Sequence, residues 1–190
     1  MSRESKHKTE ATSDPAQGEL QQTLEACESP EAACSKLAQI LRVSRNEIAL
    51  LRLEKGTLRF IYPAEFHNAG AIPLSGSAVA GRTAVTRTPF LSNSFARVKH
   101  VSLFESVKLH TGESGEQSDP MPIQKIISVP MIAAGEKVVG VVQISRKGLD
   151  PSLAGADFTP EDMKLLEQAA TILASLPFMG DDASISQASS

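Results

Sequence analysis

The stretch that decides the fold is IQKIISVPMIAAGEKVVGVVQISRK, which occupies residues 123–147. Two apolar runs rich in β-branched residues, 126–133 and 138–145, flank a short polar turn of sequence Ala-Gly-Glu-Lys. A turn that contains Gly between two such runs predicts an antiparallel hairpin. Neither face of the first run is clearly polar, so both faces need cover. We therefore expect this hairpin to lie in the middle of a sheet.

Two residues of the hairpin carry expectations of their own. Pro130 has no N–H to donate to a strand ladder, so we expect a bulge or a gap in the pairing there. Gly140 has no side chain, which lets a helix or a ligand approach the backbone closely.

Length and composition indicate one globular domain with loose ends. The chain has 190 residues, 41% of them hydrophobic, and a net charge of −3. Segments that are polar and poor in aliphatic residues cannot bury enough surface to fold. We expect disordered tails over residues 1–18 and 178–190, and one domain over residues 19–177.

The same composition argues against several classes of partner. A pI near 5.8 and the scarcity of aromatic residues, with no Trp and one Tyr, do not favour nucleic-acid binding. No apolar run approaches the roughly 18 residues needed to span a membrane. The polar N-terminus lacks the apolar core of a signal peptide, so we expect a cytoplasmic protein.

The elements on either side of the hairpin follow an α+β order around an antiparallel sheet. Ser29 and Pro30 indicate a helix start, and the sequence Thr-Pro-Glu-Asp at 159–162 indicates a second one. In chain order we predict helical segments over 19–43, a hairpin over 48–62, a helix over 77–87, a short strand over 90–92 and a helix over 159–176.

With this order of elements, the chain resembles the GAF domain family over roughly residues 20–176. The stretches that carry the likeness are LSGSAVAGR at 74–82, TPFL at 88–91, ISVPM at 127–131, VVGVVQ at 138–143 and FTPED at 158–162. The resemblance implies a GAF/PAS-like central antiparallel β-sheet with the N- and C-terminal helices packed on one face, where such domains often dimerise. On the other face it implies a small-molecule pocket, roofed by residues 90–122.

The segment expected to face that pocket supplies the candidate ligand-binding residues. A few converging polar groups in an apolar cavity fix the orientation of a small ligand. The alternative is that Ser92 and Asn93 form a turn, while the two phenylalanines after them fill a core without a ligand. The candidates are Phe90, Ser92, Asn93, Phe95, Phe104, Ser106 and Ser128.

Cyclic nucleotides are one ligand class that the resemblance raises. Family members that bind them carry an Asn-Lys, Phe, Asp-Glu signature after the last hairpin. Phe158 and Asp162 fit it, but residues 145–147 read Ser-Arg-Lys and Met163 replaces the Glu. Packing and helix capping already explain the two residues that match, so the sequence does not favour cyclic nucleotides.

Catalysis is the other possibility, since a branch of the family reduces free methionine sulfoxide with cysteines near the pocket. The two cysteines, Cys27 and Cys34, both precede the expected sheet and lie seven residues apart. A rise of about 10 Å within one helix forbids a disulfide between them, so we interpret them as small buried residues. The sequence thus predicts that the chain is not an enzyme, predicts no metal site and identifies no cofactor.

The leading interpretation is a stand-alone sensory or regulatory module that binds an unidentified small molecule. It is expected to form a homodimer through its terminal helices and to signal to a separate partner protein. The first alternative is a ligand-free dimerisation or scaffold module, and the second is an enzyme of the free methionine sulfoxide reductase type.

Overall fold

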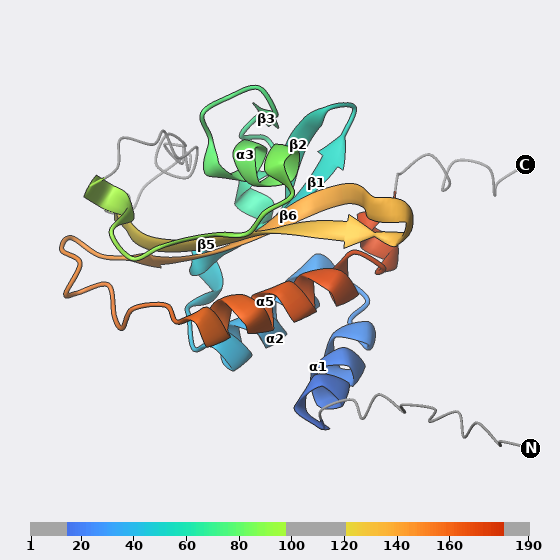
Figure 1. Cartoon of the computed structure of the whole chain (residues 1–190), viewed down its shortest axis with the longest axis horizontal. Helices are drawn as coiled ribbons and strands as arrows, with labels where there is room; N and C mark the ends of the chain where they lie inside the picture. The colour runs from blue at the N-terminus through green and yellow to red at the C-terminus, as the bar shows by residue number, and fades with distance from the viewer. Residues whose placement is uncertain (1–14, 98–120, 181–190) are drawn as a thin grey trace, which may run out of the picture.

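A six-stranded antiparallel sheet organises the computed structural model, which describes residues 15–97 and 121–180 (Figure 1). Its strand order is β3-β2-β1-β6-β5-β4, so β5 and β6 lie inside the sheet. All neighbouring strands run antiparallel. The strands are β1 Ile48–Glu54, β2 Thr57–Tyr62, β3 Ala71–Pro73, β4 Phe90–Ser92, β5 Ile123–Ala133 and β6 Lys137–Lys147.

The predicted central hairpin is confirmed in type and position. Strands β5 and β6 are each 11 residues long, and each is flanked by a neighbouring strand on its outer side. The first nine residues of β5 are all buried, as the apolar character of both its faces predicts. This hairpin is therefore the rigid centre on which the helices of both layers pack.

The two special positions of the hairpin behave partly as expected. Pro130 itself pairs with Val141, and the register shifts after Met131, so the irregularity lies beside the proline. A Cβ atom added to Gly140 would overlap the carbonyl oxygen of Leu51 on β1. The close approach at this glycine is thus made by a neighbouring strand, where we had expected a helix or a ligand.

The helices form two layers, one on each face of the sheet (Figure 1). Three of them share one apolar core with one sheet face, which confirms that the terminal helices pack together there. The short helix α3 covers the other face and contributes Ala80 and Ala84 to a separate core. The helices are α1 Pro15–Glu25, α2 Pro30–Leu41, α3 Val79–Thr86 and α5 Pro160–Leu173.

The predicted helix starts are confirmed by their caps. The Ser29 side chain accepts a hydrogen bond from the Ala32 amide at the start of α2. At the start of α5, the Asp162 amide donates to Thr159 Oγ1 at 3.1 Å, and the Thr159 amide donates to Asp162 Oδ2 at 2.8 Å. Each bond satisfies an amide that the first helical turn leaves without an intrahelical partner.

The folded part of the chain reaches further than the range 19–177 expected for the domain. Helix α1 begins at Pro15, and Leu20 and Leu24 on it are buried in the helical core. At the other end Met179 is only 3% exposed and belongs to the same core. The rest of both expected tails lies outside the described residues. In the described part of the chain, no helix combines the length and the apolar character needed to cross a membrane.

Candidate functional site

A polar cluster is buried between α3 and the sheet. Thr83 Oγ1 donates to Ser128 Oγ at 2.8 Å, and Gln143 Nε2 donates to the same oxygen at 3.1 Å. The three side chains are 2%, 0% and 5% exposed, respectively. Because buried polar groups without partners are costly, the bond from Thr83 ties α3 to β5, and the bond from Gln143 links β6 to the same hydroxyl.

A shallow cleft of about 180 Å³ runs along α3 to the start of β4, next to this cluster. Thr83 belongs to both, so the cleft leads directly to the buried bonds. The lining supplies four hydroxyl groups, one guanidinium and one aromatic ring. Sites for drug-sized ligands are usually about 300–1,000 Å³, so this cleft suits a smaller, polar molecule. The lining residues are Ser77, Val79, Arg82, Thr83, Thr86, Thr88, Pro89 and Phe90.

Two of the predicted site residues, Phe90 and Ser128, lie at this site. They are cross-strand partners on β4 and β5, so their side chains occupy one face of the sheet. Phe90 lines the cleft, and Ser128 is the acceptor at the centre of the buried cluster. Ser92 follows two residues after Phe90 on the half-buried edge strand β4, and its hydroxyl accepts a hydrogen bond from the Ser94 amide.

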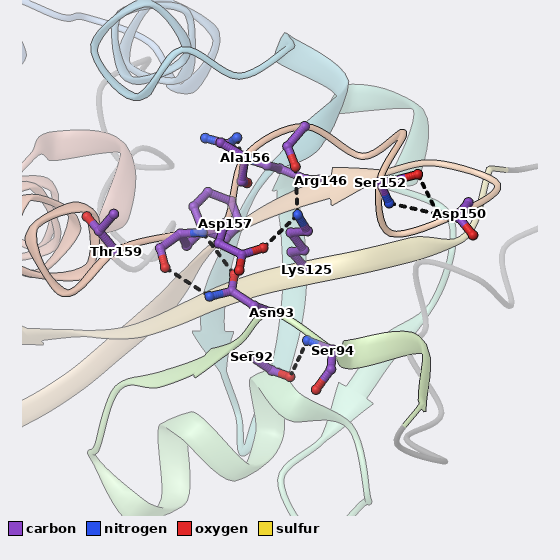
Figure 2. A network of polar contacts seen from close by, with 12 residues as sticks. Ser92, Asn93, Ser94, Lys125, Arg146, Asp150, Ser152, Ala156, Asp157 and Thr159 are labelled. Carbon is purple, nitrogen blue, oxygen red and sulfur yellow. Dashed lines mark hydrogen bonds and ion pairs between the residues drawn. The ribbon is translucent and has the colours of Figure 1, made fainter.

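Asn93 differs from the expectation, because its side chain points away from the cleft. Its Nδ2 donates to the carbonyl oxygen of Phe158 at 2.9 Å, and the Phe158 amide donates to its Oδ1 at 2.8 Å (Figure 2). Phe158 belongs to the core on the helical face, where Leu91 also packs. Side chains alternate between faces along a strand, which places Leu91 and Asn93 opposite Phe90.

Of the remaining three candidates, only Phe95 lies among the described residues, and it does not line the cleft. Phe95 is 1% exposed and packs with Val79, Ile123 and Ile126, so it fills a small core at the start of β5. This packing agrees with the alternative interpretation of that residue. Phe104 and Ser106 lie outside the described residues, and their assignment as ligand-binding residues stays a prediction.

Sequence reasoning missed Gln143 and Thr83 as site residues. Gln143 could have been found, since it is a lone polar residue in the apolar run of β6 and is buried there. Thr83 could not, because no residue near it in the chain indicates its partner Ser128 on the sheet.

A second polar network holds the loop between β6 and α5 against the sheet (Figure 2). Lys125 Nζ donates to the carbonyl oxygen of Gly155 at 2.6 Å and lies 2.7 Å from Asp157 Oδ1. Arg146 Nη1 donates to the carbonyl oxygen of Ala156 at 2.8 Å, and its guanidinium lies 4.6 Å from the centre of the Phe158 ring. These bonds set the position from which α5 begins.

Both cysteines lie away from the cleft, in the core between the helices and the opposite face of the sheet. Cys34 on α2 is fully buried and Cys27 is 7% exposed. Burial raises the pKa of the Cys34 thiol far above its usual value, because a thiolate cannot be solvated there. At neutral pH this thiol is therefore protonated and a poor nucleophile.

Comparison with known proteins shows which family shares this architecture. The model of the family described as GAF domain matches residues 20–176. The GAF domain of an Acinetobacter phosphoenolpyruvate-protein phosphotransferase is similar over 83% of this chain and 87% of its own, with 14% identity and a TM-score of 0.58. A putative GAF sensor protein from Burkholderia vietnamiensis is similar over 84% and 89%, with 17% identity and a TM-score of 0.54. No sequence among the curated proteins matches the chain.

The prediction that the chain is not an enzyme is wrong as it was made. A type II free methionine-R-sulfoxide reductase from Thermoplasma acidophilum is similar over 83% of this chain and 91% of its own, with 16% identity and a TM-score of 0.52. The same fold therefore carries catalysis, and the absence of a cysteine after Cys34 was too narrow a reason to exclude every reaction. At this identity the likeness shows the fold and assigns no activity to the chain.

Proposed function

This chain belongs to the GAF domain family, and we propose that it is a sensory or regulatory module that binds a small molecule in the α3 cleft. The observation that carries the proposal is the contact between the cleft and a buried polar cluster through one residue, Thr83. A ligand that contacts this threonine competes for, or reinforces, the hydrogen bond from Thr83 to Ser128 that ties α3 to the sheet. Ligand binding then shifts the population of α3 positions, and a separate partner protein reads the result.

Native mass spectrometry of the protein purified from its own cells tests the binding step. Thr86 lines the cleft, so Thr86→Phe fills it and is expected to remove the mass of any retained ligand. The matched control is Val85→Phe, because Val85 is the preceding residue of the same helix, is 59% exposed and does not line the cleft. A ligand retained equally by both variants would place its site elsewhere.

We also propose that the module is a homodimer through its terminal helices. A groove of about 550 Å³ lies between α1 and α5, and Glu25, Lys164 and Glu167 are among the residues that line it. In a two-fold contact the same patch meets itself, so Lys164 of one protomer can face an acid of the other. Sedimentation equilibrium should show weaker association for Lys164→Glu and for Glu167→Lys. Association is expected to recover when both changes are combined.

The alternative function is a dimerisation or scaffold module without a ligand. Two observations favour it: the cleft is smaller than most ligand sites, and Phe95 is buried in a small apolar core beside it. The two proposed functions predict different results in the mass spectrometry experiment. A dimer that carries no added mass, and that no member of a metabolite library stabilises against heat, would support the scaffold.

A further inference from the structure

The hydrogen bonds between Asn93 and Phe158 join two parts of the molecule that are 65 residues apart in the chain. Asn93 directly follows β4, whose first residue, Phe90, lines the cleft. Phe158 directly precedes Thr159, the N-cap of α5. The side-chain amide donates one bond and accepts another, so it holds the Phe158 backbone as an adjacent strand would (Figure 2).

Phe158 cannot move without α5. Its ring is buried in the helical core, 3% exposed, beneath the Arg146 guanidinium. Thr159 and Asp162 then close the capping box that begins the helix. A displacement of the Phe158 backbone is therefore a displacement of the first turn of α5.

The strand that carries Asn93 is the more movable side of this connection. Strand β4 has three half-buried residues, lies at the edge of the sheet and pairs with β5 alone among the described strands. Lys125 and Arg146 also hold the loop before α5, but they extend from the long central strands, which pair on both sides. Elements with few pairing bonds shift at lower cost than central ones.

Given the proposed ligand site, on which this step rests, we infer that Asn93 transmits the state of the α3 cleft to helix α5. A group in the cleft displaces Phe90 and with it β4. Asn93 carries that displacement to Phe158, and α5, which lies in the proposed dimer face, changes its position. Asn93 is thus a positioning residue, and it does not touch the ligand.

A double-mutant cycle on the full chain tests the inference without a known ligand. Thr86→Phe stands in for an occupied cleft, Asn93→Ala breaks the connection, and the third variant combines both. The readout is hydrogen exchange at the amides of Asp162 and Met163, which bond to Thr159 in the first turn of α5. The exchange rate of the Val142 amide in β6 corrects for changes in global stability.

Thr86→Phe is expected to change exchange at Asp162 and Met163 several-fold when Asn93 is present, and by less than twofold when it is Ala. Ser94→Ala is the matched control, because Ser94 is the next residue, is exposed, and bonds to Ser92 through its backbone amide, which the substitution keeps. In that background the several-fold change should persist. Asn93→Asp keeps the acceptor for the Phe158 amide and loses the donor, so it should give an intermediate response.

Equal changes with and without Asn93, or no change at α5 in any background, would overturn the inference. Either result leaves the proposed function open, since ligand retention in the cleft is measured separately by mass spectrometry. Conversely, the protein could show the Asn93-dependent change in exchange at α5 and yet retain no small molecule. That result would support the role of Asn93 and contradict the sensory function.

Discussion

Gly140 on β6 lies so close to Leu51 on β1 that a Cβ atom at residue 140 would overlap the Leu51 carbonyl oxygen. The same Cβ would lie 2.7 Å from Met131 Cε and 2.9 Å from Met179 Cε. Methionine side chains can move, but the carbonyl belongs to the sheet backbone. The central pairing of the fold thus depends on the absence of a side chain at this position.

Gly140→Ala should therefore destabilise the protein by about 3 kcal/mol, because β6 must separate from β1 to admit the methyl group. Urea unfolding followed by circular dichroism measures the change. A loss below about 0.5 kcal/mol would mean that the two strands adjust without cost, which would contradict the overlap.

Gly18→Ala is the matched change at a position with free space. Gly18 lies in α1, and a Cβ there would meet no atom within 4 Å. Alanine favours a helix over glycine by up to about 1 kcal/mol, so this variant should be more stable than the natural chain in the same urea assay. An unchanged stability would indicate that α1 is not helical at Gly18 in solution.

Ser128→Ala should cost about 2 kcal/mol, because it leaves the Thr83 hydroxyl and the Gln143 amide buried without their acceptor. Thr83→Val removes one donor and leaves the bond from Gln143 to Ser128 in place, so it should cost less. Thermal and urea unfolding of both variants give the comparison. If the valine variant were the less stable one, Ser128 would not be the centre of the cluster.

Thr159→Ala should destabilise the protein by about 1 kcal/mol through loss of the α5 cap. The amide exchange of Asp162 should rise with it, since its acceptor is the threonine hydroxyl. Ser29→Ala at the start of α2 provides the comparison, because Ser29 accepts a single bond of the same kind. An unchanged exchange rate at Asp162 would indicate that the cap bond is absent in solution.

Alkaline pH should weaken the fold through Cys34. Burial raises the pKa of this thiol in the folded protein, while the unfolded thiol ionises near its usual pKa of about 8.5. The stability is therefore complete below that pH and falls as pH rises above it, because only the unfolded state releases the proton. Urea unfolding between about pH 7 and 10 should show a steeper loss for the natural chain than for Cys34→Ala. Parallel curves would contradict the burial of the thiol.

The sequence by itself determined the features that depend on neighbours in the chain. The hairpin over 123–147, the α2 cap at Ser29 and the α5 cap at Thr159 follow from turn chemistry, residue alternation and capping within a few positions. These local preferences also set the order of elements, and that order together with short stretches such as LSGSAVAGR at 74–82 indicated the family.

Only the tertiary structure decided which distant side chains meet. Phe90 on β4 lines the cleft, whereas Asn93, the residue after β4, bonds to Phe158 on the other face of the sheet. Thr83 donates a hydrogen bond to Ser128, which lies 45 residues away in the chain. No residue near either of them in the sequence indicates this pairing. Such pairs depend on strand register and on the position of α3 over the sheet, which the whole fold sets and no short stretch encodes.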